Sequence, residues 1–235
     1  MRIKILLIST LFCFALFGQM SKNVGLFQIT STIPTDYVAY YPFNGNANDE
    51  SGNGWNGTVD GAVLDTGRTG SVNDSYSFDG VNDEITTSLL FNSFTELSVS
   101  IWVYPLSTAG YRTLWSNRET TACNGEALYY SLSANEVSVR IGGTLSEQAT
   151  ADITNDWVHF VVVFGSNTVK IYKNNIEIQN TALTTTIKGD EGFTIGSYSG
   201  CTTSGSGVYF NGKIDDVFIY DRALTVDEVS NLFNE

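Results

Sequence analysis

The chain has 235 residues, and its 25 acidic residues against 12 basic ones give a formal net charge of −13 at pH 7. A strongly acidic surface argues against binding to nucleic acids and to anionic membranes, but it is compatible with binding of cations or of neutral ligands such as glycans. Only 16% of the residues are charged, and small polar residues are abundant, which is typical of many short β-strands joined by polar turns.

The first 19 residues have the pattern of a signal peptide. Arg2 and Lys4 give a positively charged start, and residues 5–17 follow as an apolar run. This run is too short to cross a bilayer, which takes about 20 residues, and it has the length of a signal-peptide core. We therefore expect residues 1–19 to be removed. The mature protein should lack a membrane span and act outside the cytoplasm, either secreted, at the cell surface or in the periplasm.

The rest of the chain is predicted to be one all-β domain preceded by a linker. Residues 20–35 are polar and lack hydrophobic periodicity, so we expect the linker there. Residues 36–235 show strand signals at short intervals, each bounded by turn residues. The first three are at residues 37–43, 58–64 and 76–78. A β-sandwich of this length is commonly a single domain.

The middle of the chain contains the clearest strand patterns. Apolar and polar residues alternate at 97–104 and at 137–141, which predicts strands with one buried and one solvent-facing side. Residues 156–164 (DWVHFVVVF) are apolar on both sides and predict a central strand covered on both faces. A hairpin is predicted around Lys173–Asn174, because asparagine tolerates the left-handed conformation that such turns need. The last long strand is predicted within residues 208–220.

One helix is predicted, at the C-terminal end of the chain. Thr225 and Glu228 have the spacing of a capping box, in which each side chain accepts from the backbone N–H of the other residue. Four apolar residues after the cap fall on one helical face: Val226, Val229, Leu232 and Phe233. We expect a short terminal helix that packs on the sandwich.

Two of the three cysteines remain after removal of the signal peptide. Cys123 and Cys201 both lie in loops of small residues. In an oxidising compartment, such a pair is most simply interpreted as one disulfide that joins the two loops. Two free thiols are the alternative.

Four segments form an ordered set that spans about residues 36–234. They are residues 41–57 (YPFNGNANDESGNGWNG), 76–83 (YSFDGVND), 97–105 (LSVSIWVYP) with 156–159 (DWVH) and 169–174 (VKIYKN) after it, and 212–224 (GKIDDVFIYDRAL). In order and spacing, this set resembles the laminin-G-like jelly-roll domains of the concanavalin A-like family. The resemblance implies an all-β fold, a jelly-roll sandwich of two antiparallel sheets, usually with a structural calcium ion. It also implies a glycan-binding surface on the concave sheet or its rim loops.

Calcium binds six to eight oxygen atoms from carboxylates, amides, backbone carbonyls and water. The glycine-rich loop around Asp49 and Asn53 offers such oxygens, and Asp215 and Asp216 offer two more carboxylates before the last long strand. With the family resemblance, these four residues are our candidate ligands for a structural Ca²⁺ ion. An asparagine-rich turn and a solvated acidic pair are the alternative. Neighbouring strand residues point to opposite sides, so the choice between Asp215 and Asp216 stays open.

A catalytic role is not expected. A retaining glycosidase needs two carboxylates about 5–5.5 Å apart, and the glycosidases that this family resembles place them on one strand as E-x-D-x-x-E, a pattern that is missing here. Glu136 has only Ser138 and Arg140 on its side of the predicted strand. The one histidine, His159, lies in a predicted core strand and is expected to be structural. We therefore expect a binding protein; a divergent glycosidase or lyase on the same fold is the alternative.

A glycan site needs exposed aromatic rings that stack on sugar faces and polar groups that bind hydroxyls. Our candidate ligand-binding residues lie close together in the sequence: Tyr111, Arg112, Trp115, Arg118, Tyr129 and Arg140. Packing within the sheets is the alternative for each aromatic residue. The sequence thus predicts an exported, calcium-stabilised module that binds a glycan or polysaccharide or mediates adhesion, with a surface protein as the alternative partner.

Overall fold

The computed structural model describes residues 32–106, 110–118, 125–131, 135–141, 144–150, 156–182, 186–198 and 209–235; in 118, 144–148 and 150 only the backbone is described. The predicted signal peptide, most of the predicted linker, and both Cys123 and Cys201 lie outside these residues. Residues 33–235 form one compact unit. In the described part of the chain, no helix has the length and apolar character needed to cross a membrane.

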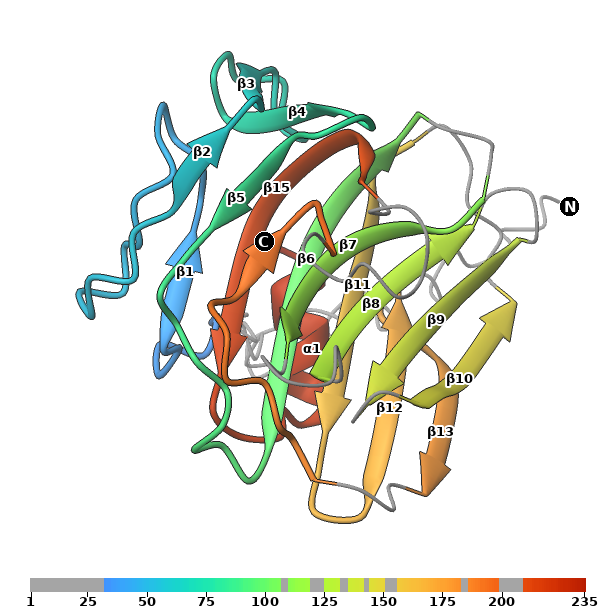
Figure 1. Ribbon diagram of the computed structural model, residues 1–235. Coiled ribbons are helices and arrows are strands. Elements are labelled where there is room, and N and C mark those ends of the chain that lie inside the picture. Colours follow the sequence, from blue (N-terminus) through green and yellow to red (C-terminus); the bar gives the residue numbers. More distant parts are fainter. Residues whose placement is uncertain are drawn as a thin grey trace, which may run out of the picture. The chain divides into compact units, whose positions relative to one another are not determined.

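The described strands form two antiparallel sheets that pack face to face (Figure 1). The eight-stranded sheet has the order β13 (Ile176–Ala182), β12 (Thr168–Lys173), β11 (Val158–Phe164), β6 (Leu97–Pro105), β15 (Asn211–Tyr220), β4 (Ser75–Asp79) and β3 (Val63–Asp65), with β1 (Ala39–Tyr41) also paired to β15. The seven-stranded sheet has the order β10 (Thr144–Thr150), β9 (Glu136–Ile141), β8 (Gly125–Ser131), β7 (Arg112–Arg118), β14 (Thr194–Ile195), β5 (Glu84–Thr86) and β2 (Thr58–Asp60). The predicted two-sheet antiparallel sandwich is confirmed.

The main hydrophobic core lies between the two sheets. From β6 it takes the alternating residues Leu97, Val99, Ile101 and Val103, which are at most 1% exposed. Strand β11 lies between β12 and β6 and is buried along its whole length, as its apolar sequence predicts. Alternation along each strand therefore places one set of side chains in a close-packed interior.

A second apolar layer covers the other face of the eight-stranded sheet. Helix α1 (Val226–Phe233) buries Val229 and Leu232 against this face. Because the helix lies there, Ser98 and Ser100 of β6 are buried as well, although their polar character predicts a solvent-facing side. Val226, predicted on the apolar side of the helix, is instead 55% exposed.

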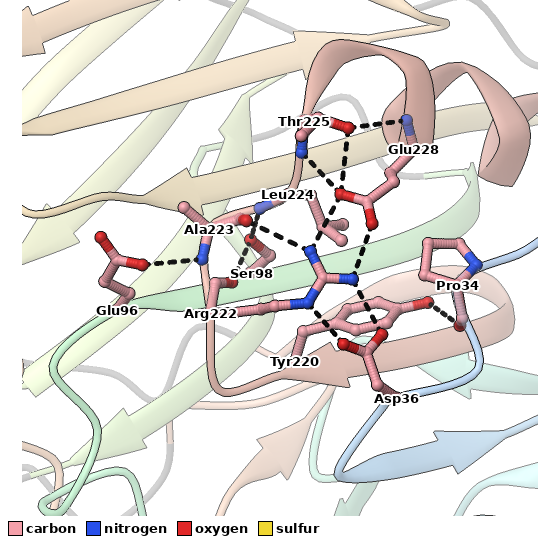
Figure 2. Close-up of polar contacts among 10 residues, drawn as sticks. All are labelled: Pro34, Asp36, Glu96, Ser98, Tyr220, Arg222, Ala223, Leu224, Thr225 and Glu228. Carbon is pink, nitrogen blue, oxygen red and sulfur yellow. Dashed lines mark hydrogen bonds and ion pairs between the residues drawn. The ribbon is translucent and has the colours of Figure 1, made fainter.

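Arg222 joins the two ends of the domain (Figure 2). Its guanidinium donates to both carboxylate oxygens of Asp36 (2.6 and 2.8 Å) and to both oxygens of Glu228 (2.9 and 2.7 Å). These charge-assisted bonds raise the pKa of Arg222 and lower that of Asp36. Glu228 also accepts from the backbone of Thr225, which completes the predicted capping box. The sequence motif before the helix is therefore a clip between the first described residues and α1.

The remaining predictions hold to within a few residues. The predicted hairpin turn lies one position later, at Asn174 and Asn175, whose φ angles of 46° and 64° are those of a type I′ turn. The strand predicted at residues 58–64 is interrupted at Gly61, which has a φ of 78°, and divides into β2 and β3. Strands β5, β7, β8 and β10 were not predicted.

Candidate functional site

A groove with a volume of about 500 Å³ lies beside the start of β6. Its apolar side chains include Trp55, Leu90 and Phe94, and its polar side chains include Asn53, Ser88 and Asn92. We call this feature the Trp55 groove. The residues that line it are Val38, just before β1, and residues of the loop after β1 and of the connection between β5 and β6. Figure 1 shows these segments on the β1 side of the sandwich.

The loop that carries Trp55 is held by one buried carboxylate. Asp49 accepts hydrogen bonds from the backbone N–H groups of Tyr40 (3.1 Å), Ser51 (2.9 Å) and Trp55 (3.1 Å), and from the Ser51 hydroxyl (2.8 Å). On its other side, the carbonyl of Trp55 accepts from the Tyr41 hydroxyl at 2.7 Å. Both backbone groups of Trp55 are thereby fixed, so the indole is presented from a rigid loop.

The opposite wall of the groove is held by hydrogen bonds and by a close approach of two backbones. The N–H of Phe193 donates to the carbonyl of Leu89, and the N–H of Thr87 donates to the carbonyl of Phe193. A Cβ on Gly192 would collide with the carbonyl oxygen of Thr87, so glycine permits this approach. Leu89 is buried by the packing, while its neighbour Leu90 is 39% exposed at the groove.

All the described side chains that line the Trp55 groove are uncharged. Asn53 donates its amide N–H to the Val38 carbonyl at 3.0 Å, which orients the amide at the groove's edge. Two aromatic rings with amides and hydroxyls around them can stack on the apolar face of a sugar and bind its hydroxyl groups. The arrangement suits a neutral, hydroxyl-rich ligand better than an ion.

Trp115, the central residue of the ligand site predicted from the sequence, lies in the core. It is fully buried, with its ring edge-to-face to Phe91 and Phe164 and near that of Phe193. The ring therefore has no surface to offer a ligand. For Trp115, packing within the sandwich is the observed role.

Two other predicted residues do come together on the outer side of the seven-stranded sheet. The ring of Tyr129 packs against that of Tyr198 with centroids 5.8 Å apart, and the guanidinium of Arg140 lies 5.6 Å from the Tyr198 ring. Tyr129 is 5% exposed, and burial raises its pKa. With so little exposed surface, Tyr129 cannot provide a stacking platform for a sugar.

The remaining predicted ligand residues lie apart from the Trp55 groove. Tyr111 is 38% exposed, and its hydroxyl donates to Glu136 at 2.9 Å. Arg112 donates to the carbonyl of Tyr209 at 3.3 Å. The side chain of Arg118 and the predicted Cys123–Cys201 disulfide lie outside the described residues. Neither Tyr111 nor Arg112 lines the groove.

The four predicted calcium ligands do not form one site in the structure. Around Asp49 the carboxylate oxygens face hydrogen-bond donors, which occupy the positions that a cation would need. Asn53 directs its amide nitrogen to the Val38 carbonyl. Among the residues that the structure describes, no three histidine, cysteine, aspartate or glutamate side chains are grouped so that they could hold a metal ion.

Asp215 and Asp216 interact with a protein cation instead. Asp216 forms an ion pair with the Arg68 guanidinium (2.8 Å), and Asp215 accepts from the backbone N–H of Arg68 (2.9 Å). Burial, together with the charge of Asp216, raises the pKa of Asp215 to about 7. As arranged here, the side chains at the four predicted positions therefore do not fit a calcium ion. Calcium binding stays a prediction of the sequence.

The buried side chains of Glu126 and His159 have structural partners. Glu126 is fully buried and accepts from the backbone N–H groups of Lys188 and Gly189, both at 3.1 Å. His159 is 1% exposed, with Nε2 2.7 Å from the Ser100 hydroxyl, and burial lowers its pKa to about 3. These contacts support the structural role expected for His159.

No groove residue was predicted from the sequence to bind a glycan, and Asn53 alone among them was a candidate calcium ligand. Trp55 entered only as part of a family-like segment, and Leu90 and Phe94 were not considered. One signal was present: residues 88–94 (SLLFNSF) hold four apolar residues in a segment with no predicted strand. Exposed apolar residues in a connection between strands indicate a binding surface more directly than aromatics within a strand do.

The comparisons with known proteins agree with the fold. The model of the concanavalin A-like lectin/glucanases superfamily matches residues 78–230. The chain belongs to this superfamily. The resemblance drawn from the four sequence segments is thereby confirmed. A comparison with curated protein sequences found no match.

Several solved structures share the sandwich. The botulinum neurotoxin serotype D binding domain has a TM-score of 0.66 at 16% identity, with 86% of this chain and 51% of that chain covered. Domain 4 of an extracellular arabinanase from Geobacillus stearothermophilus, solved with arabinotriose, has a TM-score of 0.64 at 19% identity, covering 84% of this chain and 98% of that domain. A Trypanosoma rangeli sialidase has a TM-score of 0.65 at 15% identity, covering 85% of this chain and 32% of the sialidase. The chain thus spans about half the length of the toxin binding domain, and the likeness shows a shared fold.

Proposed function

We propose that the protein is a carbohydrate-binding module that acts outside the cytoplasm, with its glycan in the Trp55 groove. The observation that carries this proposal is the groove itself, in which Trp55 and Phe94 stand among uncharged amides and hydroxyls. Aromatic stacking with a few oriented polar groups is the usual chemistry of a small-molecule pocket that recognises sugars. Action outside the cytoplasm follows from the signal-peptide pattern of residues 1–19.

The named structures give this proposal support at the level of the fold. The arabinanase domain was solved with arabinotriose, and a toxin ligand-binding domain was solved with N-acetylneuraminic acid. Both are sandwiches like this one, so the scaffold is compatible with glycan recognition. The side chains that recognise a glycan are specific to each protein, because function belongs to sites rather than to folds.

Binding without catalysis is part of the proposal. General acid–base catalysis of glycoside cleavage needs carboxylates at the bond that breaks, and the part of the groove lining that the structure describes contains none. We expect the purified protein to release no reducing ends or unsaturated products from β-glucans, alginate, carrageenans or pectins. Turnover that accompanies the protein through purification would instead establish the divergent glycosidase or lyase.

A glycan array with two tryptophan variants tests the site. Trp55→Ala should weaken binding by at least about tenfold, because it removes the stacking surface. Trp157→Ala is the matched control: Trp157 is also half-buried and packs on Tyr104. Trp157 directly precedes Val158 of β11, which pairs with Val103 of β6, so it lies about 20 Å along β6 from Leu97, where that strand begins near the groove.

Each outcome of the array decides something. Loss of glycan binding in the Trp55 variant alone supports the groove. Equal binding by both variants and the unaltered protein would move the site elsewhere. Absence of binding to every glycan, together with a protein partner that binds independently of sugars, would replace the proposal with a surface protein-interaction module.

A further inference from the structure

A second hollow adjoins the Trp55 groove. It has a volume of about 360 Å³ and shares Asn92, Ser93 and Phe94 with the groove. On its far side it is lined by Ser166, in the connection between β11 and β12, and by Thr186 and Ile187 before β14. We call it the Thr186 hollow. The segment 92–94 therefore lines both cavities.

Carboxylates behind the walls hold the Thr186 hollow in shape. The Ser166 hydroxyl donates to one oxygen of Glu96 at 2.6 Å. The other oxygen of Glu96 accepts from the backbone N–H of Ala223 at 3.3 Å, a bond that Figure 2 shows. The hydrogen bond from Ser166 is the main reason that the pKa of Glu96 is lowered. Glu126 fixes the chain just after Ile187 through two backbone N–H groups. The acidic groups support the walls from behind and do not line the cavity.

The charge distribution favours one class of sugar. Among the described residues that line the Trp55 groove or the Thr186 hollow, none has a charged side chain. A uronic or sialic acid would find no cationic partner among these lining residues, and the chain's net charge of −13 would oppose its approach. Amides and hydroxyls around an aromatic ring serve the hydroxyl groups of a neutral sugar equally well in both cavities.

We propose that the Trp55 groove and the Thr186 hollow are consecutive subsites for a neutral oligosaccharide of at least two linked sugars. Phe94 is the wall common to both cavities, so a chain that occupies both crosses this residue. This inference rests on the proposed function and adds chain-length dependence and charge selectivity to it. A linked second sugar binds at a high effective concentration, so affinity rises with length until both subsites are filled.

Titration calorimetry with defined saccharides measures this dependence. Neutral gluco-, xylo- and arabino-oligosaccharides of one to four units are compared with oligouronates of the same lengths. For the series that binds, we expect affinity to rise at least about tenfold between the single sugar and the trimer and then to level off. Oligouronates should bind at least about tenfold more weakly than the neutral series.

Two variants fill one cavity each. Ser88 lines only the Trp55 groove and Thr186 lines only the Thr186 hollow, and both are exposed. Ser88→Phe should remove binding of every length. Thr186→Phe should leave the affinity for the single sugar unchanged and abolish the gain with length. Circular dichroism melts confirm that each variant is folded.

The failures of the two proposals are distinguishable. If affinity does not depend on length and Thr186→Phe binds like the unaltered protein while Ser88→Phe does not bind, the second subsite is wrong and the Trp55 groove stands. Oligouronates that bind as tightly as neutral sugars overturn the charge selectivity. If no saccharide binds at all, the proposed function itself is refuted.

Discussion

The Trp55 groove and the region beneath α1 differ in where their charges are placed. Beneath α1, Arg68 pairs with Asp216, bonds through its backbone to Asp215, and lies 5.0 Å over the ring of Trp102. Trp102 in turn stacks on His159. We call these five residues the Arg68 cluster. The groove, in contrast, is lined by uncharged side chains.

This difference separates the charged residues that stabilise the fold from the neutral residues that line the groove. In the Arg68 cluster, charge holds the chain together: Arg68 also donates to the carbonyl of Glu235 at 3.1 Å, and Phe233 of α1 stacks on Trp102. Buried charges need partners, and here the partners are other parts of the fold. The neutral groups at the groove form no ion pairs, and we propose that they recognise the ligand.

The largest expected effect comes from an aromatic residue that the sequence assigned to ligand binding. Trp115→Ala should lower the free energy of unfolding by about 3–5 kcal/mol, because it leaves a large cavity between the sheets. Urea unfolding followed by circular dichroism measures the loss. Trp55→Ala should cost much less, since Trp55 is only partly buried. Equal losses in the two variants would contradict the division between core and groove.

The Arg68 cluster should be the next most sensitive region. Arg68→Ala leaves Asp216 without its cation and should cost about 3 kcal/mol. The matched control is Lys213→Ala, which breaks the more exposed Lys213–Asp65 pair and should cost less than about 1 kcal/mol. Urea unfolding of both variants, of Asp216→Asn and of the Arg68→Ala/Asp216→Asn double variant measures the coupling energy between Arg68 and Asp216. A coupling energy near zero would show that the ion pair is not what holds the cluster.

Acid should destabilise the protein through His159. Because burial lowers the folded-state pKa of His159 from 6.5 to about 3, the unfolded chain binds a proton that the folded chain refuses at intermediate pH. Stability is therefore lost as the pH falls from 6.5 toward 3, at about 1.4 kcal/mol per pH unit. Asp215 acts in the opposite sense: its raised pKa makes stability fall as the pH rises from about 4 to 7.

Comparison with His159→Asn isolates the histidine, because Asp215 is present in both proteins. The difference in unfolding free energy between the two should change by about 2 kcal/mol or more from pH 6.5 to pH 4.5, to the disadvantage of the unaltered protein. Urea titrations of both proteins at several pH values measure this difference in unfolding free energy. Parallel pH profiles would show that His159 takes up its proton in the folded state.

The fold could be predicted because its signals are local. Alternation in β6, the apolar run of β11 and the capping box at Thr225 each depend on residues close in sequence. The pattern failed where other elements cover a strand. Ser138 of β9 reads as solvent-facing and is buried, and Ser98 of β6 is covered by the segment that leads to α1. The sequence of a strand alone does not show which other segments of the chain pack over it.

The site could not be predicted, and Trp115 shows why. The pairing of β7 with β8 shifts register between Thr113 and Trp115, so Leu114 and Trp115 both enter the core. Across such an irregularity, the alternation of apolar and polar residues does not show which face of the sheet a side chain occupies. The Trp55 groove joins a loop after β1 with a segment more than thirty residues later, and that proximity exists only in the folded chain.

The smallest expected effect is that of calcium on the destabilisation caused by Asp49→Ala. An ion that binds only the folded protein stabilises it by about 2.7 kcal/mol at a hundredfold excess over its Kd, and the resemblance of the Asp49 loop to its family predicts such an ion. In the structure, however, the four hydrogen bonds of Asp49 all come from the protein. Asp49→Ala should therefore destabilise the protein by the same amount in excess calcium and in chelator. Melting of both proteins under both conditions measures this difference. A loss that appears only with calcium would make Asp49 a metal ligand and would mean that the loop rearranges to bind it.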